Sequence, residues 1–174
     1  MLLEDTNLVT LWHGGSASLS SEFRDISGAK GKWEYGPGLY ASPDMWYVID
    51  HYARGSRRLW KIEAELDSAY NDVSVQLPIN DCVDFLRVYV GSAKRKELQS
   101  LLEYYAHSGN VQAMIFLNVV ASDTVQRRYT PQLRRFLIDH KVKYRAVDIY
   151  GTTFYVIFDP SVIVSAKVVS RSDI

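Results

Sequence analysis

The sequence predicts an α+β fold with a mainly antiparallel core of two sheets and helices inserted in the middle of the chain. Apolar and charged residues alternate along Leu59–Leu66, which is the pattern of a half-exposed antiparallel strand. In the middle of the chain the apolar residues recur at helical spacing, most clearly in Ser92–His107. The last third returns to short strand-like runs separated by turns, and such close spacing favours antiparallel pairing.

The first third of the chain is expected to supply two strands and a helix. Leu8–His13 is predicted to be a buried strand, and residues 16–32, which are polar and rich in small side chains, a loop with a short helix. Leu39–Ala41 follows a Gly-Pro-Gly turn as a second, short strand. The next three residues, Ser-Pro-Asp, are typical of a helix start, with Ser42 as the N-cap and proline at the first helical position.

The remaining elements are assigned from the same signals. A short strand is predicted before Pro78, and Asn110–Val120 fits either a helix or a strand. Helices are predicted over Asp81–Val90, over Ser92–His107 and from Thr130 onward, and strands over Lys143–Tyr150, Phe154–Phe158 and Val162–Ser170.

The bulk composition is that of a single globular domain over residues 1–174. Apolar residues make up 47% and charged residues 23%, which argues against disorder, and a net charge of zero points to no class of partner. The single cysteine, Cys82, excludes an internal disulfide and a cysteine metal cluster, and the four histidines are scattered, so we expect no metal. We find no signal-peptide pattern and no apolar run of membrane-spanning length, and therefore expect a cytoplasmic protein without membrane contact.

Positive charge is distributed unevenly along the chain. Between Arg127 and Arg145 lie seven lysines and arginines, against the single acid Asp139. This segment is a candidate basic face for phosphates or for an acidic protein. The alternative interpretation is an ordinary solvated helix face.

The candidate site residues gather in the stretch Leu8–Ala53. The first strand ends in His13 followed by two glycines, and glycines let the backbone approach a ligand closely. The second strand presents Tyr40, and the following helix presents Tyr52. We therefore expect a nucleotide-sized cleft walled by aromatic rings. Taken singly, a histidine at a strand end is usually a hydrogen-bonded polar residue, and a tyrosine is usually a core or rim aromatic.

The order of four short motifs resembles one enzyme family. The motifs are His13-Gly14, the Gly-Leu-Tyr-Ala-Ser run at 38–42, Tyr52-Ala53, and the Tyr-Val-Ile-Phe-Asp-Pro run at 155–160. In this order they resemble the ADP-ribosyltransferases of the diphtheria-toxin and poly-ADP-ribose-polymerase type. That family has a His-Tyr-Glu triad on a two-sheet fold that holds NAD. The resemblance covers both ends of the chain and skips its middle, where the family varies.

The resemblance implies a role for each matching residue. His13 would hydrogen-bond the ribose and carboxamide side of NAD, and Gly14 would offer backbone groups to the nicotinamide amide. Tyr40 and Tyr52 would lie on opposite sides of the nicotinamide ring. The implied NAD-binding set is completed by Gly15, Ser16, Ala41 and Ser42. NAD is thus implied as the substrate, and no metal is needed.

The third member of the triad does not match. The family's glutamate commonly stands just before the extended run, and Phe154 holds that position here. Some relatives carry an apolar residue there and transfer a single ADP-ribose. Alternatively, Asp148 supplies the carboxylate, because small phage-type relatives, including an anti-CRISPR transferase, have an acid just ahead of a Gly-Thr turn. We prefer Asp148, although it also fits a turn cap; Glu34 is a weaker acid candidate.

The implied reaction breaks the nicotinamide–ribose bond, and the sugar becomes oxocarbenium-like, as in glycoside cleavage. A carboxylate near the ribose would stabilise that charge, and losing one comparable preorganised interaction typically costs about 2.7–4 kcal/mol. We therefore expect a mono-ADP-ribosyltransferase that modifies a macromolecular acceptor, either a protein or a nucleic acid. Its size suits a bacterial or phage effector, or a toxin whose partner is an antitoxin or inhibitor protein.

Two other hypotheses remain open. The absence of the family's glutamate is also consistent with an inactive transferase fold that grips NAD or a partner without chemistry. A structural or accessory protein with accidental motif matches is the third.

Overall fold

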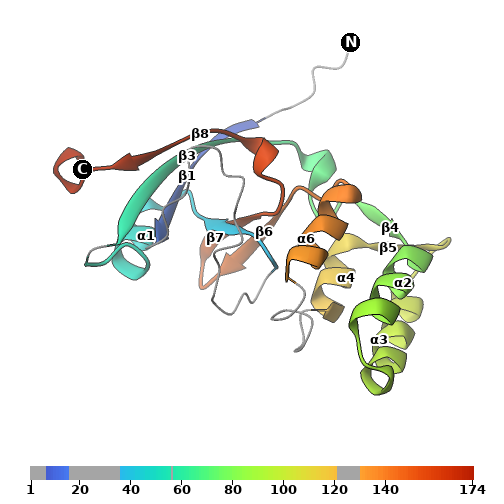
Figure 1. Cartoon of the computed structure of the whole chain (residues 1–174). Coiled ribbons are helices and arrows are strands. Elements are labelled where there is room, and N and C mark those ends of the chain that lie inside the picture. The colour runs from blue at the N-terminus through green and yellow to red at the C-terminus, as the bar shows by residue number, and fades with distance from the viewer. Residues whose placement is uncertain (1–6, 16–35, 56, 121–129) are drawn as a thin grey trace, which may run out of the picture.

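The computed structural model has an α+β architecture, which confirms the predicted fold class (Figure 1). It describes residues 7–15, 36–55, 57–120 and 130–174. Within these ranges the strands are β1 (Asn7–Gly15), β2 (Leu39–Ala41), β3 (Arg58–Leu66), β4 (Gln76–Pro78), β5 (Asn110–Gln112), β6 (Tyr144–Ile149), β7 (Thr152–Ile157) and β8 (Ile163–Val169). The α-helices there are α1 (Met45–His51), α2 (Ile79–Tyr89), α3 (Ser92–Tyr105), α4 (Ala113–Val120) and α6 (Thr130–Asp139).

The described strands form three antiparallel sheets rather than the two that the sequence predicts. One three-stranded sheet has the order β1-β3-β8, the other has the order β2-β7-β6, and β4 pairs with β5 alone. Asn110–Val120, which fits either a helix or a strand by sequence, contains both: β5 comes first and α4 follows directly after it. The pairing of β5 with β4 forms the small third sheet. The alternating run Leu59–Leu66 is the central strand β3, as its pattern indicates.

Two backbone hydrogen bonds join the two three-stranded sheets at one corner. The Trp12 N–H donates to the Ser42 carbonyl at 2.7 Å, and the Ser42 N–H donates to the Trp12 carbonyl at 2.9 Å. This bridge places the end of β1 against the end of β2. His13, directly after Trp12, and Tyr40, two residues before Ser42, are therefore brought close together by the backbone.

The N-cap of α1 differs from the one that the sequence predicts. Asp44, not Ser42, is the capping residue, and its Oδ1 accepts a hydrogen bond from the Tyr47 N–H at 3.0 Å. The Ser42 hydroxyl is buried and donates to the Thr153 carbonyl at 2.8 Å, while it accepts from the Asp44 N–H at 3.1 Å. Ser42 thus ties β2 to the β7 region, and the helix begins two residues later than a serine cap would place it.

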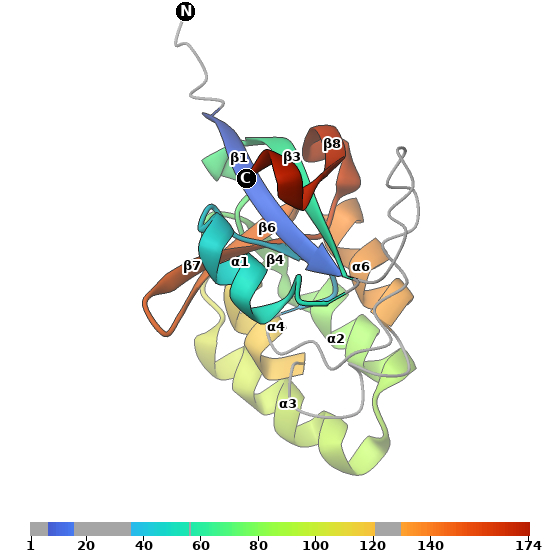
Figure 2. The ribbon, with the colours of Figure 1, turned by 90° about the vertical axis from the view of Figure 1, so that its left-hand side faces the viewer.

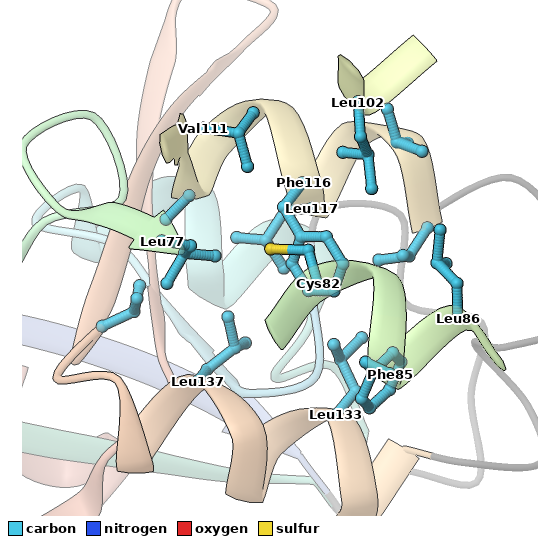
Figure 3. Close-up of a cluster of buried hydrophobic side chains, with 14 of the residues drawn as sticks. Leu77, Cys82, Phe85, Leu86, Leu102, Val111, Phe116, Leu117, Leu133 and Leu137 are labelled. Carbon is cyan, nitrogen blue, oxygen red and sulfur yellow. The ribbon is translucent and has the colours of Figure 1, made fainter. Parts of the chain in front are cut away.

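The described buried side chains form one core among the helices, another between the sheets, and a small third cluster of Val48, Ala53 and Leu59 beside α1. Helices α2, α3, α4 and α6 gather on one side of the molecule, and α1 lies apart from them (Figures 1 and 2). The core shared by these four helices includes Cys82, Phe116 and Leu137 (Figure 3). It also contains Val156 of β7 and Phe158, which follows that strand. Cys82 is buried and serves as a small core residue, as predicted. Burial also raises the pKa of its thiol to about 12.

The second core lies between the two three-stranded sheets. Leu11 and Ile62 from one sheet pack with Leu39 and Ile157 from the other, and all four are almost completely buried. Full burial of one such side chain typically stabilises the fold by about 1.5–3 kcal/mol. This core fixes the distance between the sheets beside the corner.

Arg145 is buried, which corrects part of the predicted basic face. Its Nε lies 3.0 Å from Oδ2 of the buried Asp72, and its guanidinium donates to Asn118 Oδ1 at 2.7 Å. Arg145 therefore joins β6 to α4 inside the protein and is not offered to a partner. Arg127 and Arg128 lie outside the described residues.

The Asp72 carboxyl has a raised pKa of about 6, compared with an ordinary value of 3.8, because burial outweighs the attraction of Arg145. Between these values the folded protein binds the proton more tightly than the unfolded chain. The stability from this group is therefore complete below pH 3.8 and is lost as the pH rises through 6.

The Asp72→Asn variant cannot titrate at this position, so we expect its unfolding free energy to lack the pH dependence that Asp72 gives the wild type. The unfolding free energy of the wild type, minus that of the variant, should fall from pH 4 to pH 6 and then level off. Urea denaturation of both proteins at one-unit pH steps measures it. A difference that is constant across this range, or that rises with pH, would contradict the raised pKa.

Candidate functional site

A cleft of about 470 Å³ opens beside the corner where β1 meets β2. It is walled by the end of β1, by β2, by α1 and by the β6–β7 hairpin. Its lining residues are Trp12, His13, Gly14, Tyr40, Tyr47, Val48, Tyr52, Ile149, Tyr150 and Phe154. Four of the predicted site residues, His13, Gly14, Tyr40 and Tyr52, are thus brought together in one hollow.

His13 is fixed at the base of the cleft by the backbone of β2. Its Nδ1 lies 2.7 Å from the Tyr40 carbonyl oxygen. A carbonyl can only accept a hydrogen bond, so Nδ1 carries the proton and a neutral His13 has an acceptor lone pair on Nε2. Burial lowers the pKa of His13 below its ordinary value of 6.5, and the hydrogen bond to Tyr40 opposes this only in part. The ring is therefore suited to orienting a ligand hydroxyl.

Tyr40 is held by hydrogen bonds of both its backbone carbonyl and its phenol hydroxyl. Its carbonyl accepts from His13, and its phenol O–H donates to the Gly36 carbonyl at 2.8 Å. The ring lines the cleft between these two anchors. Fixing an aromatic ring in this way reduces the rotamer entropy that a ligand would have to remove on binding.

Gly14 is required by the close approach of β1 to the end of α1. A Cβ atom at this position would lie 2.7 Å from the carbonyl carbon of Tyr52 and 2.9 Å from the nitrogen of Ala53. These are backbone atoms, so no side-chain rotation can relieve the contact. The glycine after His13 therefore has a packing reason that is independent of any ligand.

An aromatic cluster forms one wall of the cleft. The Phe154 ring meets Tyr47 edge to face, with centroids 5.6 Å apart, and meets Tyr52 in the same manner at 5.9 Å. Tyr47 in turn stacks on His51, with centroids 4.0 Å apart and an angle of 12° between the rings. Such pairs typically contribute about 0.5–1.5 kcal/mol each beyond buried area.

Tyr47 and Tyr150 are lining residues that the sequence analysis misses. Tyr47 precedes His51 by four positions in α1, a spacing that puts the two rings on one helix face and is the signal that could have found it. Tyr150 lies in the hairpin turn, and its place at the cleft follows from tertiary structure rather than from a local pattern.

Asp148, for which the sequence analysis predicts a catalytic role, is not among the residues that line the cleft. It pairs with Thr153 across the hairpin, whereas the lining residue Phe154 pairs with Val147, and neighbouring positions on a strand face opposite sides of the sheet. The Asp148 carboxylate is exposed and accepts a hydrogen bond from the Gly151 N–H at 2.9 Å. It caps the turn, which is the structural alternative for this residue.

The other predicted contact residues lie around the cleft rather than in it. Gly15 ends β1 next to Gly14, and Ala41 and Ser42 are fully buried beneath the corner. Ser16 and Glu34 lie outside the described residues. Phe154, at the position of the family's glutamate, does face the cleft. None of the described residues that line this hollow carries a carboxylate.

No three His, Cys, Asp or Glu side chains among the described residues are grouped so that they could hold a metal ion. None of the helices in the same part of the chain is long and apolar enough to cross a membrane.

Comparison with known proteins does not assign the chain to a family. No family model matches the sequence, and no curated protein matches it. The crystal structure of an anti-CRISPR protein aligns over 97% of this chain and 100% of its own length, with 10% identity and a TM-score of 0.44. A likeness of this size identifies neither a fold family nor a function.

We expect Gly14→Ala to lower the unfolding free energy by about 1–3 kcal/mol, because the new methyl group would overlap the backbone of α1. Gly91→Ala is the matched control, since a Cβ there meets nothing within 4 Å. Thermal or urea denaturation measures both. A Gly14→Ala protein as stable as the control would contradict the close approach.

His13 is expected to titrate below pH 6.5, so that it is neutral at pH 7. The measurement is a pH titration of the histidine ring signals by NMR, with His13→Gln used to assign the resonance. A midpoint at or above 6.5 would mean that the ring is not desolvated as the structure indicates.

Proposed function

We propose that this protein is an NAD-dependent mono-ADP-ribosyltransferase that uses the cleft beside the β1–β2 corner. The observation that carries the proposal is the convergence of His13, Tyr40 and Tyr52. Three separate elements of the chain contribute them, and each matches its place in the family motif by sequence. The proposal rests on this convergence together with the sequence resemblance.

The cleft suits the nicotinamide end of NAD in size and chemistry. Its volume of about 470 Å³ falls in the usual range of ligand pockets, which is about 300–1,000 Å³. The nicotinamide of NAD is a flat cation, and the faces of tyrosine rings attract cations. Tyr40 and Tyr52 would hold this ring, and the Nε2 of His13 would accept a hydrogen bond from a ribose hydroxyl.

The transfer breaks the bond between the ribose C1′ and the nicotinamide nitrogen, and nicotinamide leaves with the electron pair. A nucleophile of the acceptor forms the new bond to C1′ and gives up its proton to solvent. With Phe154 at the glutamate position, binding and orientation of the leaving ring would supply the catalysis. This is the alternative in which an apolar residue supports transfer of a single ADP-ribose.

The acceptor is a macromolecule in this proposal. A bacterial or phage effector, or a cytoplasmic toxin controlled by an inhibitor protein, is the setting that the resemblance favours. A second function, an NAD- or partner-binding module without turnover, is favoured by one observation: no carboxylate lines the cleft among the described residues.

Release of nicotinamide from NAD by the purified protein tests the proposal. We expect the wild type to release it and His13→Ala to be at least tenfold slower, because the ligand loses its anchor. His107→Ala is the matched control, since His107 is an exposed histidine away from the cleft. Release is measured by chromatography with the acceptor present in a cell lysate and absent.

Asp148→Asn separates the two roles of the hairpin acid. An asparagine keeps an oxygen that can accept from the Gly151 N–H but removes the charge. We expect release to stay within about threefold of wild type, whereas a catalytic carboxylate would cost about 10²–10³-fold. NAD binding by calorimetry with no release from any protein would instead support the binding module, and absence of binding would contradict both functions.

A further inference from the structure

We propose that the rim of the cleft binds single-stranded nucleic acid. The surface concerned, here called the aromatic–arginine rim, consists of His51, Tyr52, Arg54, Arg57, Arg58 and Tyr150. It combines exposed rings with exposed guanidinium groups on the segments that border the cleft. Binding to this rim does not depend on the proposed transferase activity; only the further claim that the bound strand is the acceptor rests on it.

The exposed rings are the first part of the argument. Tyr150 is 97% exposed and Tyr52 is 40% exposed, and both also line the cleft. Tyr150 adopts a positive φ of 51°, a conformation that costs energy for a residue with a Cβ atom. A ring so exposed gains almost nothing from packing in return. Packing within the described residues therefore does not account for the placing of this ring, and its faces are open to a ligand that stacks on it.

The hairpin holds this ring in place. The Asp148 carboxylate caps the turn through the Gly151 N–H, and Gly151 takes the second left-handed position with φ of 80°. Two consecutive residues with positive φ are the backbone of the tightest hairpin turns, which match the twist of the strands. Tyr150 is thus presented at the mouth of the cleft by a short and well-defined turn.

The arginines are the second part of the argument. Arg54 and Arg57 lie in the turn between α1 and β3, and Arg58 begins β3. All three are exposed, and no acid lies between His51 and Leu59 in the sequence. Among the described residues, no carboxylate is within ion-pair distance of these three side chains. Their charge is therefore not neutralised by the part of the protein that the structure describes.

The turn that carries the arginines is fixed to the cleft at both ends. It begins after Tyr52, which lines the cleft, and it ends at Arg58, which pairs with Gly15 at the end of β1. The Arg171 guanidinium donates to the Ala53 carbonyl and anchors the turn from the C-terminal side. In Figure 2 this turn and the β6–β7 hairpin lie on either side of α1.

Single-stranded nucleic acid is the ligand that fits both the exposed rings and the exposed arginines of the rim. Phosphates are attracted to the arginines, and unpaired bases expose the ring faces that stack on tyrosine, whereas a duplex hides them. An acidic protein would satisfy the arginines but would leave Tyr150 without a reason. The whole chain carries no net charge, so the attraction for phosphates is local to the rim.

Fluorescence anisotropy with a labelled 12-nucleotide single strand, without NAD, tests the inference. We expect Tyr150→Ala to weaken binding by about 5- to 100-fold, the range of one lost base–ring stack. The combined change of Arg54, Arg57 and Arg58 to Gln should reduce the slope of log K against log salt by about 2, from about 0.7 per phosphate contact.

Matched controls are available on the helices. Tyr104→Ala removes another exposed tyrosine, 80% exposed on α3, and Arg135→Gln removes an exposed arginine on α6. Both controls should bind like wild type. Absence of strand binding by wild type, or an equal loss in the controls, would overturn the inference, and a loss confined to Arg135→Gln would place the strand on α6 instead.

A labelled acidic peptide of the same charge distinguishes the other class of partner. If it binds with the same dependence on the arginines while the strand does not, the rim is a protein interface and the inference is wrong. Nicotinamide release by the same preparations reports on the transferase separately. Strand binding without release would leave the rim intact and contradict only the proposed function.

Discussion

Two backbone hydrogen bonds between Trp12 and Ser42 hold the site together, because they join the two three-stranded sheets at the corner beside the cleft. His13 follows Trp12 directly, and its Nδ1 reaches the carbonyl of Tyr40 across the same corner. Neither contact depends on the identity of a side chain other than His13. The cleft is thus positioned by main-chain geometry, and the inter-sheet core around Leu11 and Ile62 keeps that geometry rigid.

Much of the fold follows from local sequence patterns, and the exceptions have physical reasons. The alternation in Leu59–Leu66 predicts β3 because one face of that strand is buried and the other is not. Ser42 and Asp44 can both cap α1. Asp44 does so, because the Ser42 hydroxyl donates instead to the carbonyl of Thr153, a residue distant in sequence. The burial of Arg145 depends on Asp72 in the same way, and no local pattern contains that pairing.

The candidate site shows the same division. His13 and Tyr40 could be placed in one cleft from sequence, because each stands at a strand end beside a glycine or a short turn. The side of the sheet on which Asp148 lies could not be predicted from sequence, because β6 has no clean alternation of apolar and polar residues to indicate its faces. The cross-strand register settles it by pairing Asp148 with Thr153 rather than with a lining residue.

The separation of the helical core from the clusters between and beside the sheets has a consequence for how this protein could change over time. None of the described residues between Ile79 and Asp139 lines the cleft, yet they supply the four helices that pack behind the β2-β7-β6 sheet. The length, loops and surface charge of these helices can change so long as the packing against Tyr40, Val156 and Phe158 is kept. The exposed surface of these helices can in this way change, for example to meet a new partner, while the arrangement of the cleft is retained.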